Sequence, residues 1–167
     1  MAGATAIVDL DAALVPAYHA CLDAVARERE WLLLHEAPPV EACASFQERL
    51  RSDGGVAVVA LAGKAVVGWC DVQRLTWAGC GHVGRIGIGV AASHRARGIG
   101  RELLRAALKR CAAAGITRIE AEVFAHNVRS VRLLAGHGFE VEGMRRRVRL
   151  FEAKWDDALL LAWLSER

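Results

Sequence analysis

The chain has 167 residues, a length that suits one globular domain, and we expect residues 1–167 to form that single domain. Hydrophobic residues make up 54% and charged residues 25%, which excludes global disorder. The net charge of +3 is too mildly basic for a dedicated nucleic-acid-binding protein. No apolar run approaches the roughly 20 residues of a membrane span, and the N-terminus lacks the basic and apolar segments of a secretory signal. We therefore expect a cytoplasmic protein with neither a membrane nor a nucleic-acid partner.

The cysteines and histidines lack the spacing of disulfide frameworks and metal sites. The cysteines are odd in number, widely spaced and without a C-x-x-C pair, and no two histidines are separated by three residues. We predict no bound metal and mostly buried free thiols. The five cysteines are Cys21, Cys43, Cys70, Cys80 and Cys111.

The first half of the chain predicts a strand, two helices, a hairpin and a further strand. Residues 5–10 read as a short strand, and Asp11 is a typical N-cap for a helix that apolar spacing extends to about residue 30. Two prolines make the next segment irregular, and residues 40–51 predict a second helix. Apolar runs at 56–62 and 65–76, joined by Gly63-Lys64, predict a β-hairpin. Residues 82–90 predict a strand weakened by three glycines.

The second half alternates helices and strands. A polar, Arg-rich turn over 91–98 leads into an amphipathic helix at 98–114, followed by a strand at 116–125. Asn127 is a plausible N-cap for a short helix at 128–136, and strands follow at 139–151 and 153–164. The order β-α-α-β-β-β-α-β-α-β-β predicts an α+β (α/β layered) fold on a mixed sheet.

The segment from Ile86 to Arg105 has the features of an anion site. A strand runs through a turn rich in arginine and glycine directly into a helix, whose first N–H groups point outward with partial positive charge. Glycines allow a diphosphate to approach the backbone, and Arg95, Arg97 and Arg101 add positive charge. The alternative is a solvated arginine-rich turn. The chain has neither a G-x-x-x-x-G-K-[ST] loop nor a G-x-G-x-x-G that opens a helix.

Two motifs in this part of the chain resemble the GNAT N-acetyltransferase superfamily. Arg95-x-x-Gly98-x-Gly100, between a strand and an amphipathic helix, is similar to the acetyl-CoA motif of that family. The run from Asn127 to Phe139 is similar to its second motif, N-x-x-[AS]-x-x-L-Y-x-x-x-G-F. The resemblance covers residues from about 5 to 164. It implies a mostly antiparallel sheet of about seven strands flanked by about four helices.

The resemblance also implies acetyl-CoA as co-substrate and a set of residues that bind it. The backbone of the central strand is expected to pair with the pantetheine arm, and the N–H groups of the following turn to hold the pyrophosphate. Asn127 and Ser130 are expected to contact the arm from the other side. The alternative for Asn127 is a plain N-cap, and both roles can hold together. The residues assigned to the co-substrate are Ile88, Gly89, Val90, Arg95, Ala96, Arg97, Gly98, Ile99, Gly100, Arg101, Asn127 and Ser130.

The implied reaction is direct attack of a primary amine on the acetyl thioester. The acceptor is expected to be an amino acid, an amino-acid analogue, a polyamine or a protein N-terminus. The alternative is a non-catalytic sensor or interaction module that binds acyl-CoA. The family often has a tyrosine, which protonates the leaving thiolate, where this chain has Leu134.

The amine must lose a proton before it attacks, which requires a base. His82 is the titratable residue nearest to the central strand and is the candidate base, its alternative role being a strand-end surface histidine. Glu36, Glu120 and Glu122 are the other candidates.

Four further features give expectations about the surface, the core, the acceptor pocket and assembly. Strand alternation predicts that Arg145, Arg147 and Arg149 share a solvated face, without the interleaved aromatics of a nucleic-acid surface. The tryptophans Trp69, Trp155 and Trp163 are expected in the core. The segment Trp31–Leu33 is expected either to wall the acceptor pocket or to close the core. A homodimer is expected to use the apolar C-terminal strand.

Overall fold

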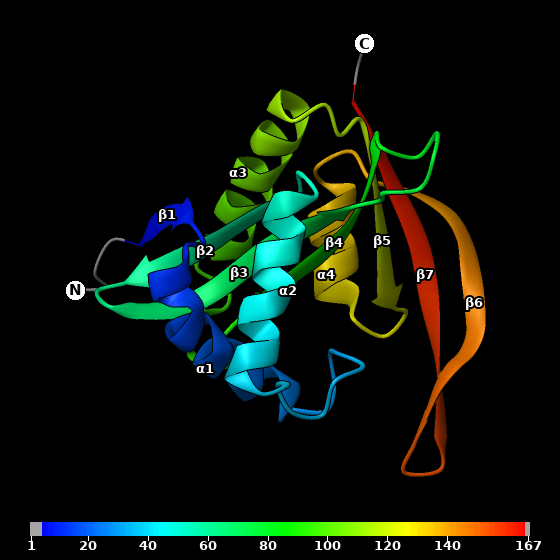
Figure 1. Ribbon diagram of the computed structural model, residues 1–167. Helices are drawn as coiled ribbons and strands as arrows, with labels where there is room; N and C mark the ends of the chain where they lie inside the picture. Colours follow the sequence, from blue (N-terminus) through cyan, green and yellow to red (C-terminus); the bar gives the residue numbers. More distant parts are fainter. Residues whose placement is uncertain (1–4, 166–167) are drawn as a thin grey trace.

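The computed structural model describes residues 5–165, whose strands form one seven-stranded sheet in the order β1-β2-β3-β4-β5-β7-β6 (Figure 1). All neighbouring strands are antiparallel except β4 and β5, which are parallel. The predicted element order and the mixed, mostly antiparallel sheet are confirmed. The strands are β1 (Ala6–Asp9), β2 (Val56–Ala62), β3 (Ala65–Arg74), β4 (Val83–Val90), β5 (Arg118–Phe124), β6 (Glu140–Phe151) and β7 (Lys154–Leu164).

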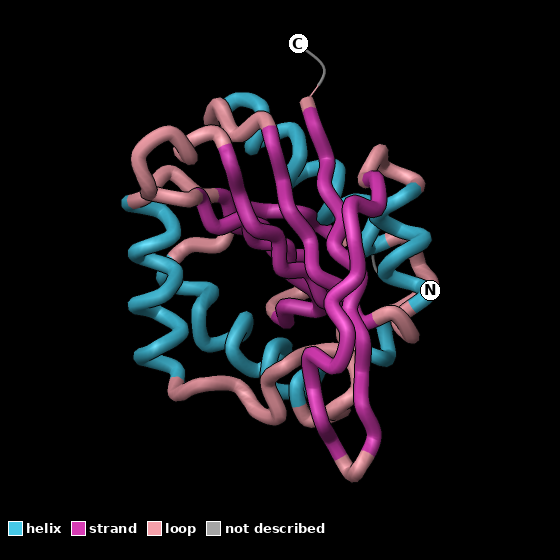
Figure 2. The backbone as a smooth tube through the Cα atoms, turned by 90° about the vertical axis from the view of Figure 1, so that its right-hand side faces the viewer, coloured by secondary structure: helices cyan, strands magenta, loops and turns pink. Residues whose placement is uncertain are grey.

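Helices cover both faces of the sheet and give the molecule two hydrophobic cores (Figure 2). One core lies under α3 and α4, where Leu103, Leu104 and Leu134 are fully buried. The other lies under α1 and α2, where Tyr18 packs edge-on against Trp69 with ring centroids 6.0 Å apart. The helices are α1 (Val15–Ala26), α2 (Val40–Ser52), α3 (Ile99–Ala113) and α4 (Val128–Ala135), and single 3₁₀ turns lie at Ala12–Leu14 and Ala92–His94.

The first helix ends earlier than apolar spacing predicts. α1 stops at Ala26, and Arg29 has a φ of +58°, which is incompatible with a continuing helix. Glu28 pairs instead with Arg95 beyond β4, and Ala37 donates its N–H to Asp23. Contacts distant in sequence therefore end the helix and hold the irregular segment that follows.

The β6–β7 hairpin projects beyond the rest of the sheet (Figure 1) and corrects two expectations. The β6–β7 register shifts between Arg145 and Arg149, and Arg147 has a φ of +55°, so strict alternation breaks down. Arg149 consequently turns inward and is 10% exposed, rather than lying on a solvated face. Trp155 is 49% exposed and packs against the Arg147 guanidinium instead of entering the core.

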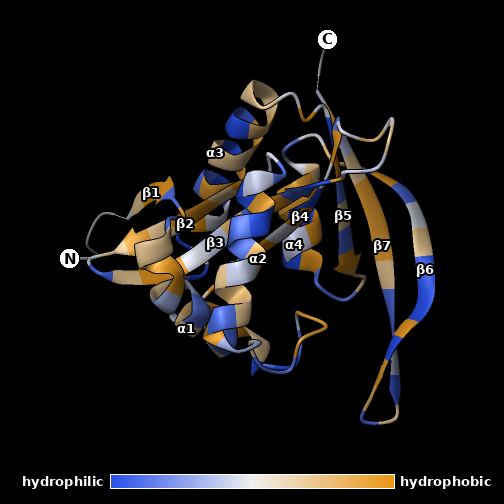
Figure 3. Cartoon of the chain, viewed as in Figure 1, coloured by the Kyte–Doolittle hydropathy of each residue, from blue (hydrophilic) through white to orange (hydrophobic). Residues whose placement is uncertain are grey.

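The apolar character of β7 comes from its position inside the sheet. β7 lies between β5 and β6, and hydrophobic residues fill much of its length while β6 is mostly hydrophilic (Figure 3). Pairing with two neighbours therefore accounts for the apolar run, and the homodimer stays a prediction. No helix within residues 5–165 is long and apolar enough to cross a bilayer. The cysteines are free, and Cys21, Cys43, Cys70 and Cys111 are buried as predicted.

Gly84 is required by close packing of β4 against β3 and against the turn between α3 and β5. A Cβ atom at this position would lie 2.4 Å from Val72 Cγ1 and 3.1 Å from Ile116 Cγ2. Overpacking a filled core costs about 1–3 kcal/mol, so Gly84→Val is expected to lower the free energy of unfolding by at least that amount in urea titrations. Gly81→Val is the matched control, because nothing lies within 4 Å of a Cβ there. Equal stability of the two variants would contradict this account of Gly84.

Candidate active site

The parallel pair β4 and β5 separates soon after it forms. Pairing runs from Val83 opposite Arg118 to Arg85 opposite Glu120 and then stops. From Ile86 to Val90, β4 is paired only with β3, so its other edge is open toward β5. An open strand edge can accept an extended ligand as an added strand.

A cavity of about 1100 Å³ follows this opening. It is lined by residues from both separated strands, by the beginnings of α3 and α4, and by α1, α2 and the segment that joins them. We call Trp31, Leu32, Leu33 and Phe46 the apolar wall of this cavity. The Trp31 segment lines this cavity, and Trp31 and Leu32 also pack against the core under α1 and α2, so both expected positions are found. That the cavity takes the acceptor stays a prediction. Most of the residues predicted to bind the co-substrate also line the cavity, namely Ile88, Gly89, Val90, Arg95, Ala96, Gly98, Ile99, Gly100, Arg101, Asn127 and Ser130, whereas Arg97 does not.

The turn before α3 has the backbone shape of an anion-binding nest. Ala96 has a φ of +61° and Gly98 a φ of +83°, so left-handed residues alternate with their neighbours. Such turns aim successive N–H groups into one concavity. No side chain caps the N-terminus of α3, which leaves its first N–H groups free to bind an anion. A left-handed alanine is uncommon, and the other one in the described residues is Ala153 in the turn between β6 and β7.

Arg95 contributes to this site differently from the expectation. Its guanidinium forms a bidentate pair with Glu28 at 2.6 and 2.7 Å, and its Nε donates to the Val90 carbonyl at 2.8 Å. Its own N–H is directed to the Ala92 carbonyl at 3.4 Å. Arg95 therefore fastens the α1–α2 segment to the end of β4 instead of presenting a free charge to an anion.

Glu28 completes a three-residue cluster at the edge of the cavity. Trp31 Nε1 donates to the Glu28 carboxylate at 2.7 Å, and the Arg95 guanidinium lies over the Trp31 ring. Burial alone would raise the pKa of Glu28, but the hydrogen bonds from Arg95 and Trp31 outweigh it and hold the pKa below its usual value. The position of Trp31 on the apolar wall is thus fixed by charged partners.

The start of α4 forms the opposite side of the cavity. Asn127 is the N-cap, and its side-chain oxygen accepts the Ser130 N–H at 3.2 Å. The capping role is confirmed, and its amide nitrogen remains available to a ligand. Leu134, at the family's tyrosine position, is 1% exposed and has no group that can donate a proton.

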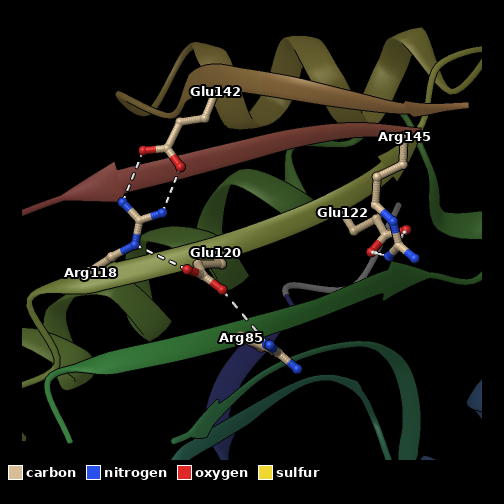
Figure 4. A network of polar contacts seen from close by, with 6 residues as sticks. All are labelled: Arg85, Arg118, Glu120, Glu122, Glu142 and Arg145. Atoms are coloured by element: carbon tan, nitrogen blue, oxygen red, sulfur yellow. Dashed lines mark hydrogen bonds and ion pairs between the residues drawn. The ribbon is translucent and has the colours of Figure 1, made fainter. Parts of the chain in front are cut away.

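The glutamates of β5 are committed to ion pairs (Figure 4). Glu120 contacts both Arg85 and Arg118, and Arg118 continues to Glu142 on β6 at 2.6 Å. Glu122 lines the cavity but is paired with Arg145 at 2.8 Å. Glu36 is paired with Arg27 and does not line the cavity. Each of the three candidate glutamates is therefore ion-paired, and the described strand β5 offers no unpaired carboxylate as a proton acceptor.

His82 does not lie in the cavity. It occupies an exposed turn before β4, at the end where β4 and β5 are still paired, and its carbonyl accepts the N–H groups of Thr117 and Arg118. This position outside the cavity favours the alternative role of His82 as a strand-end surface histidine. Sequence order along β4 does not show at which end the strands separate, so it could not place His82 relative to the cavity.

Asp71 lines the cavity and is the residue that the sequence analysis missed. It lies on β3 opposite Gly87, and burial raises its pKa to about 7. The available signal was an aspartate inside the apolar run VVGWCDVQ, on the same strand face as Trp69. His126 also lines the cavity, but it stacks on Phe124 and contacts Asp156 at 3.4 Å.

Comparison with known proteins supports the resemblance. The profile of the Acetyltransferase (GNAT) family matches residues 18–139. The chain is 29% identical over 119 residues to the L-amino acid N-acetyltransferase AaaT of Escherichia coli strain K12, covering 70% of this chain and 74% of that protein.

Solved structures share the fold. A GNAT-family acetyltransferase from Streptococcus pneumoniae superposes with a TM-score of 0.89 at 23% identity, covering 96% of this chain and 99% of that one. A phosphinothricin acetyltransferase from Sinorhizobium meliloti, solved with AcCoA, gives 0.90 at 21% identity, covering 99% and 90%. The family match, the split strands and the nest before α3 lead to one conclusion: the chain belongs to the acetyltransferase (GNAT) family, which uses acetyl-CoA as co-substrate.

Proposed function

We propose that the protein transfers the acetyl group of acetyl-CoA to the primary amine of a small molecule, an amino acid or an amino-acid analogue. The observation that carries this proposal is the continuity of the cavity. It extends from the first turn of α3, past the open edge of β4, to the apolar wall and α2. One cavity thus offers an anion-binding end, a strand edge and a separate apolar chamber.

The co-substrate occupies the first two parts of this cavity in the proposal. The N–H groups from Ala96 to Arg101 hold the pyrophosphate, and the exposed side chains of Arg97 and Arg101 add positive charge. The pantetheine arm lies along Ile88, Gly89 and Val90, with Asn127 and Ser130 on its other side. The thioester then faces the chamber where β4 and β5 diverge.

The reaction is a direct transfer. The neutral amine attacks the thioester carbon, a C–N bond forms, the C–S bond breaks, and the electron pair leaves on the sulfur of coenzyme A. One proton from the attacking nitrogen leaves as the intermediate collapses and neutralises the thiolate, directly or through water. Leu134 has no part in this transfer, so the enzyme works without a protein donor at that position.

The chamber suits an amino acid with an apolar side chain. The apolar wall would pack against the side chain, and Arg49 of α2, which also lines the cavity, would pair with the α-carboxylate. The E. coli relative is named as an L-amino acid N-acetyltransferase, which supports the same substrate class. A polyamine or a protein N-terminus lacks a carboxylate next to its amine and would not use Arg49.

Arg49→Ala is expected to raise the KM for an amino acid by about tenfold to a hundredfold, because a charge-assisted pair with the carboxylate is lost. The KM for the corresponding amino-acid amide, which has no carboxylate, should stay unchanged. Arg49→Lys keeps the charge and should restore part of the affinity. Steady-state kinetics with both acceptors measures the effect, and an equal rise for acid and amide would refute the assigned contact.

Release of free thiol from acetyl-CoA, measured with a panel of amines, tests the proposed function. The panel contains apolar and charged L-amino acids, phosphinothricin, a polyamine and a short peptide. We expect turnover with at least one amino acid or analogue and the lowest KM among the apolar members. Turnover of the peptide alone or of the polyamine alone would show that the acceptor belongs to that class and not to the amino acids. Tight binding of acetyl-CoA without turnover of any amine would favour the non-catalytic sensor.

A further inference from the structure

We infer that Asp71 is the general base of the acetyl transfer, accepting the proton of the amine across Gly87. The inference rests on the proposed function and adds to it the group that makes the amine nucleophilic. At neutral pH a primary amine of pKa near 10 is almost entirely an ammonium ion, which has no lone pair. A proton acceptor that faces the chamber is therefore required.

The strand register places Asp71 beside the point where the sheet opens. Asp71 on β3 is directly opposite Gly87 on β4, and Gly87 follows two residues after the last β4–β5 pair. Directly opposite residues on antiparallel strands are about 4.5–5.5 Å apart between Cα atoms. The carboxylate is thus one strand away from the place where the thioester would lie.

Gly87 has no side chain that would separate the Asp71 carboxylate from the cavity. A Cβ atom at residue 87 would lie 3.3 Å from Asp71 Oδ1 and 3.5 Å from Oδ2. Any side chain on this face of β4 would therefore cover the carboxylate. Gly89, two residues further, has the same role for a different neighbour, because a Cβ there would collide with the Trp69 ring. The two glycines of β4 thus leave space for the Asp71 and Trp69 side chains of the adjacent strand β3.

The groups around Asp71 leave its carboxylate without a partner. Tyr18 on α1 and Cys70 on β3 are neutral neighbours of Asp71, since burial raises the pKa of each. Cys43 on α2 lines the same cavity and is also neutral, since burial raises its pKa. Arg85 on β4 is directed to Glu120 at 3.7 Å, and Arg49 on α2 lines the same cavity. Within residues 5–165, no group donates a hydrogen bond to the Asp71 carboxylate or pairs with it.

The other titratable groups of the cavity are engaged. Glu122 is bound by Arg145, and Glu28, which lies beside the cavity without lining it, is bound by Arg95. His94 contacts Ser93, while His126 contacts the Glu30 carbonyl and Asp156. Asp71 is therefore the carboxylate in the described part of the cavity that is free to take a proton, and burial brings its pKa to about 7, where a base works at neutral pH.

The proton balance of the step is simple. The ammonium gives one proton to the Asp71 carboxylate and becomes the neutral amine that attacks the thioester. The nitrogen keeps one proton in the amide, and the third leaves on collapse of the intermediate. Asp71 then returns its proton to solvent through the open cavity.

Asp71→Asn tests this inference. We expect kcat to fall by about 10²–10⁴-fold. The rise of kcat/KM through about pH 7 should disappear, while acetyl-CoA affinity in calorimetry should change little. An amine that is already neutral at pH 7, such as an alkoxyamine, should recover most of the rate in the variant. A rise in amine KM with unchanged kcat, or no rescue by the neutral amine, would overturn the role as base.

A second variant and a stability measurement keep the test independent of folding. Gly87→Ala is expected to lower kcat because its methyl group covers the carboxylate. Folding raises the pKa of Asp71, so its carboxylate costs stability as pH rises from about 4 to 7. Asp71→Asn should therefore melt at a higher temperature than the wild type at pH 8 and at an equal temperature near pH 4. No gain at pH 8 would show that the carboxylate has a partner and would overturn the inference.

Failure of this inference is distinguishable from failure of the proposed function. If the wild-type protein acetylates an amine and Asp71→Asn retains its rate and pH profile, Asp71 is not the base and the transferase remains. In that event Glu122→Gln becomes the next variant, because Glu122 is the other aspartate or glutamate among the described residues that line the cavity. If the wild-type protein binds acetyl-CoA and turns over no amine, the proposed function itself fails.

Discussion

Gly98→Asp is expected to abolish measurable binding of acetyl-CoA, with a loss of affinity of about a thousandfold or more. Gly98 is the N-cap of α3 and has a φ of +83°, and no atom lies within 4 Å of the place where a Cβ would stand. That open space is where the proposed pyrophosphate approaches the backbone. Two like charges about 4 Å apart repel by about 4 kcal/mol at a protein surface, which corresponds to about three orders of magnitude in affinity.

Gly79→Asp is the matched control for this variant. Gly79 has a φ of +80°, and a Cβ there also meets nothing within 4 Å, but the residue lies in an exposed loop outside the cavity. Both substitutions add one negative charge and the strain of a left-handed residue, about 1–2 kcal/mol. Gly98→Ala adds the strain without the charge and should show an intermediate affinity. Calorimetric titration with acetyl-CoA measures the affinity of all three variants. An unchanged affinity in Gly98→Asp would refute the proposed pyrophosphate site in the turn before α3.

Arg149→Ala is expected to destabilise the protein by about 3–5 kcal/mol, which lowers the melting temperature by about 10 °C. Arg149 binds Asp156 at 2.7 Å, and the two side chains are only 10% and 5% exposed. Its guanidinium also lies 4.2 Å from the Phe124 ring centroid and donates to the carbonyls of Arg29 and Leu32. Removing the Arg149 side chain leaves the buried Asp156 carboxylate without this partner and removes two hydrogen bonds to the segment that carries the apolar wall.

Arg145→Ala provides the comparison for this prediction. Arg145 lies on the same strand and also pairs with a carboxylate, but its side chain is 58% exposed. Exposed pairs contribute about 0–1 kcal/mol, so this variant should melt within a few degrees of the wild type. Thermal melts by circular dichroism suffice. Similar losses in both variants would show that burial does not decide the strength of the Arg149 pair.

These two sites differ in how far sequence patterns predicted them. The glycines and arginines before α3 sit between a strand pattern and a helix pattern, so the turn and its free N–H groups followed from neighbouring residues. The inward turn of Arg149 did not follow, because it depends on a register shift in β6 and on Asp156 across the hairpin. Alternation alone predicted the opposite face.

The sequence by itself determined the element order, the helix ends marked by glycine and Asn127, and the position of the turn that we propose binds the pyrophosphate. Each of these depends on periodicity, capping and backbone conformation within a few residues. Only the tertiary structure decided which side chains meet in the cavity. Arg95 meets Glu28 across 67 positions of sequence, Asp71 faces the opening through the register of β3 on β4, and His82 lies at the closed end of the same strand. Local patterns specify the conformation of a segment, but long-range strand pairing and ion pairing determine which segments are neighbours. Those neighbours determine which side chain lies where the proposed base would accept the proton of the amine.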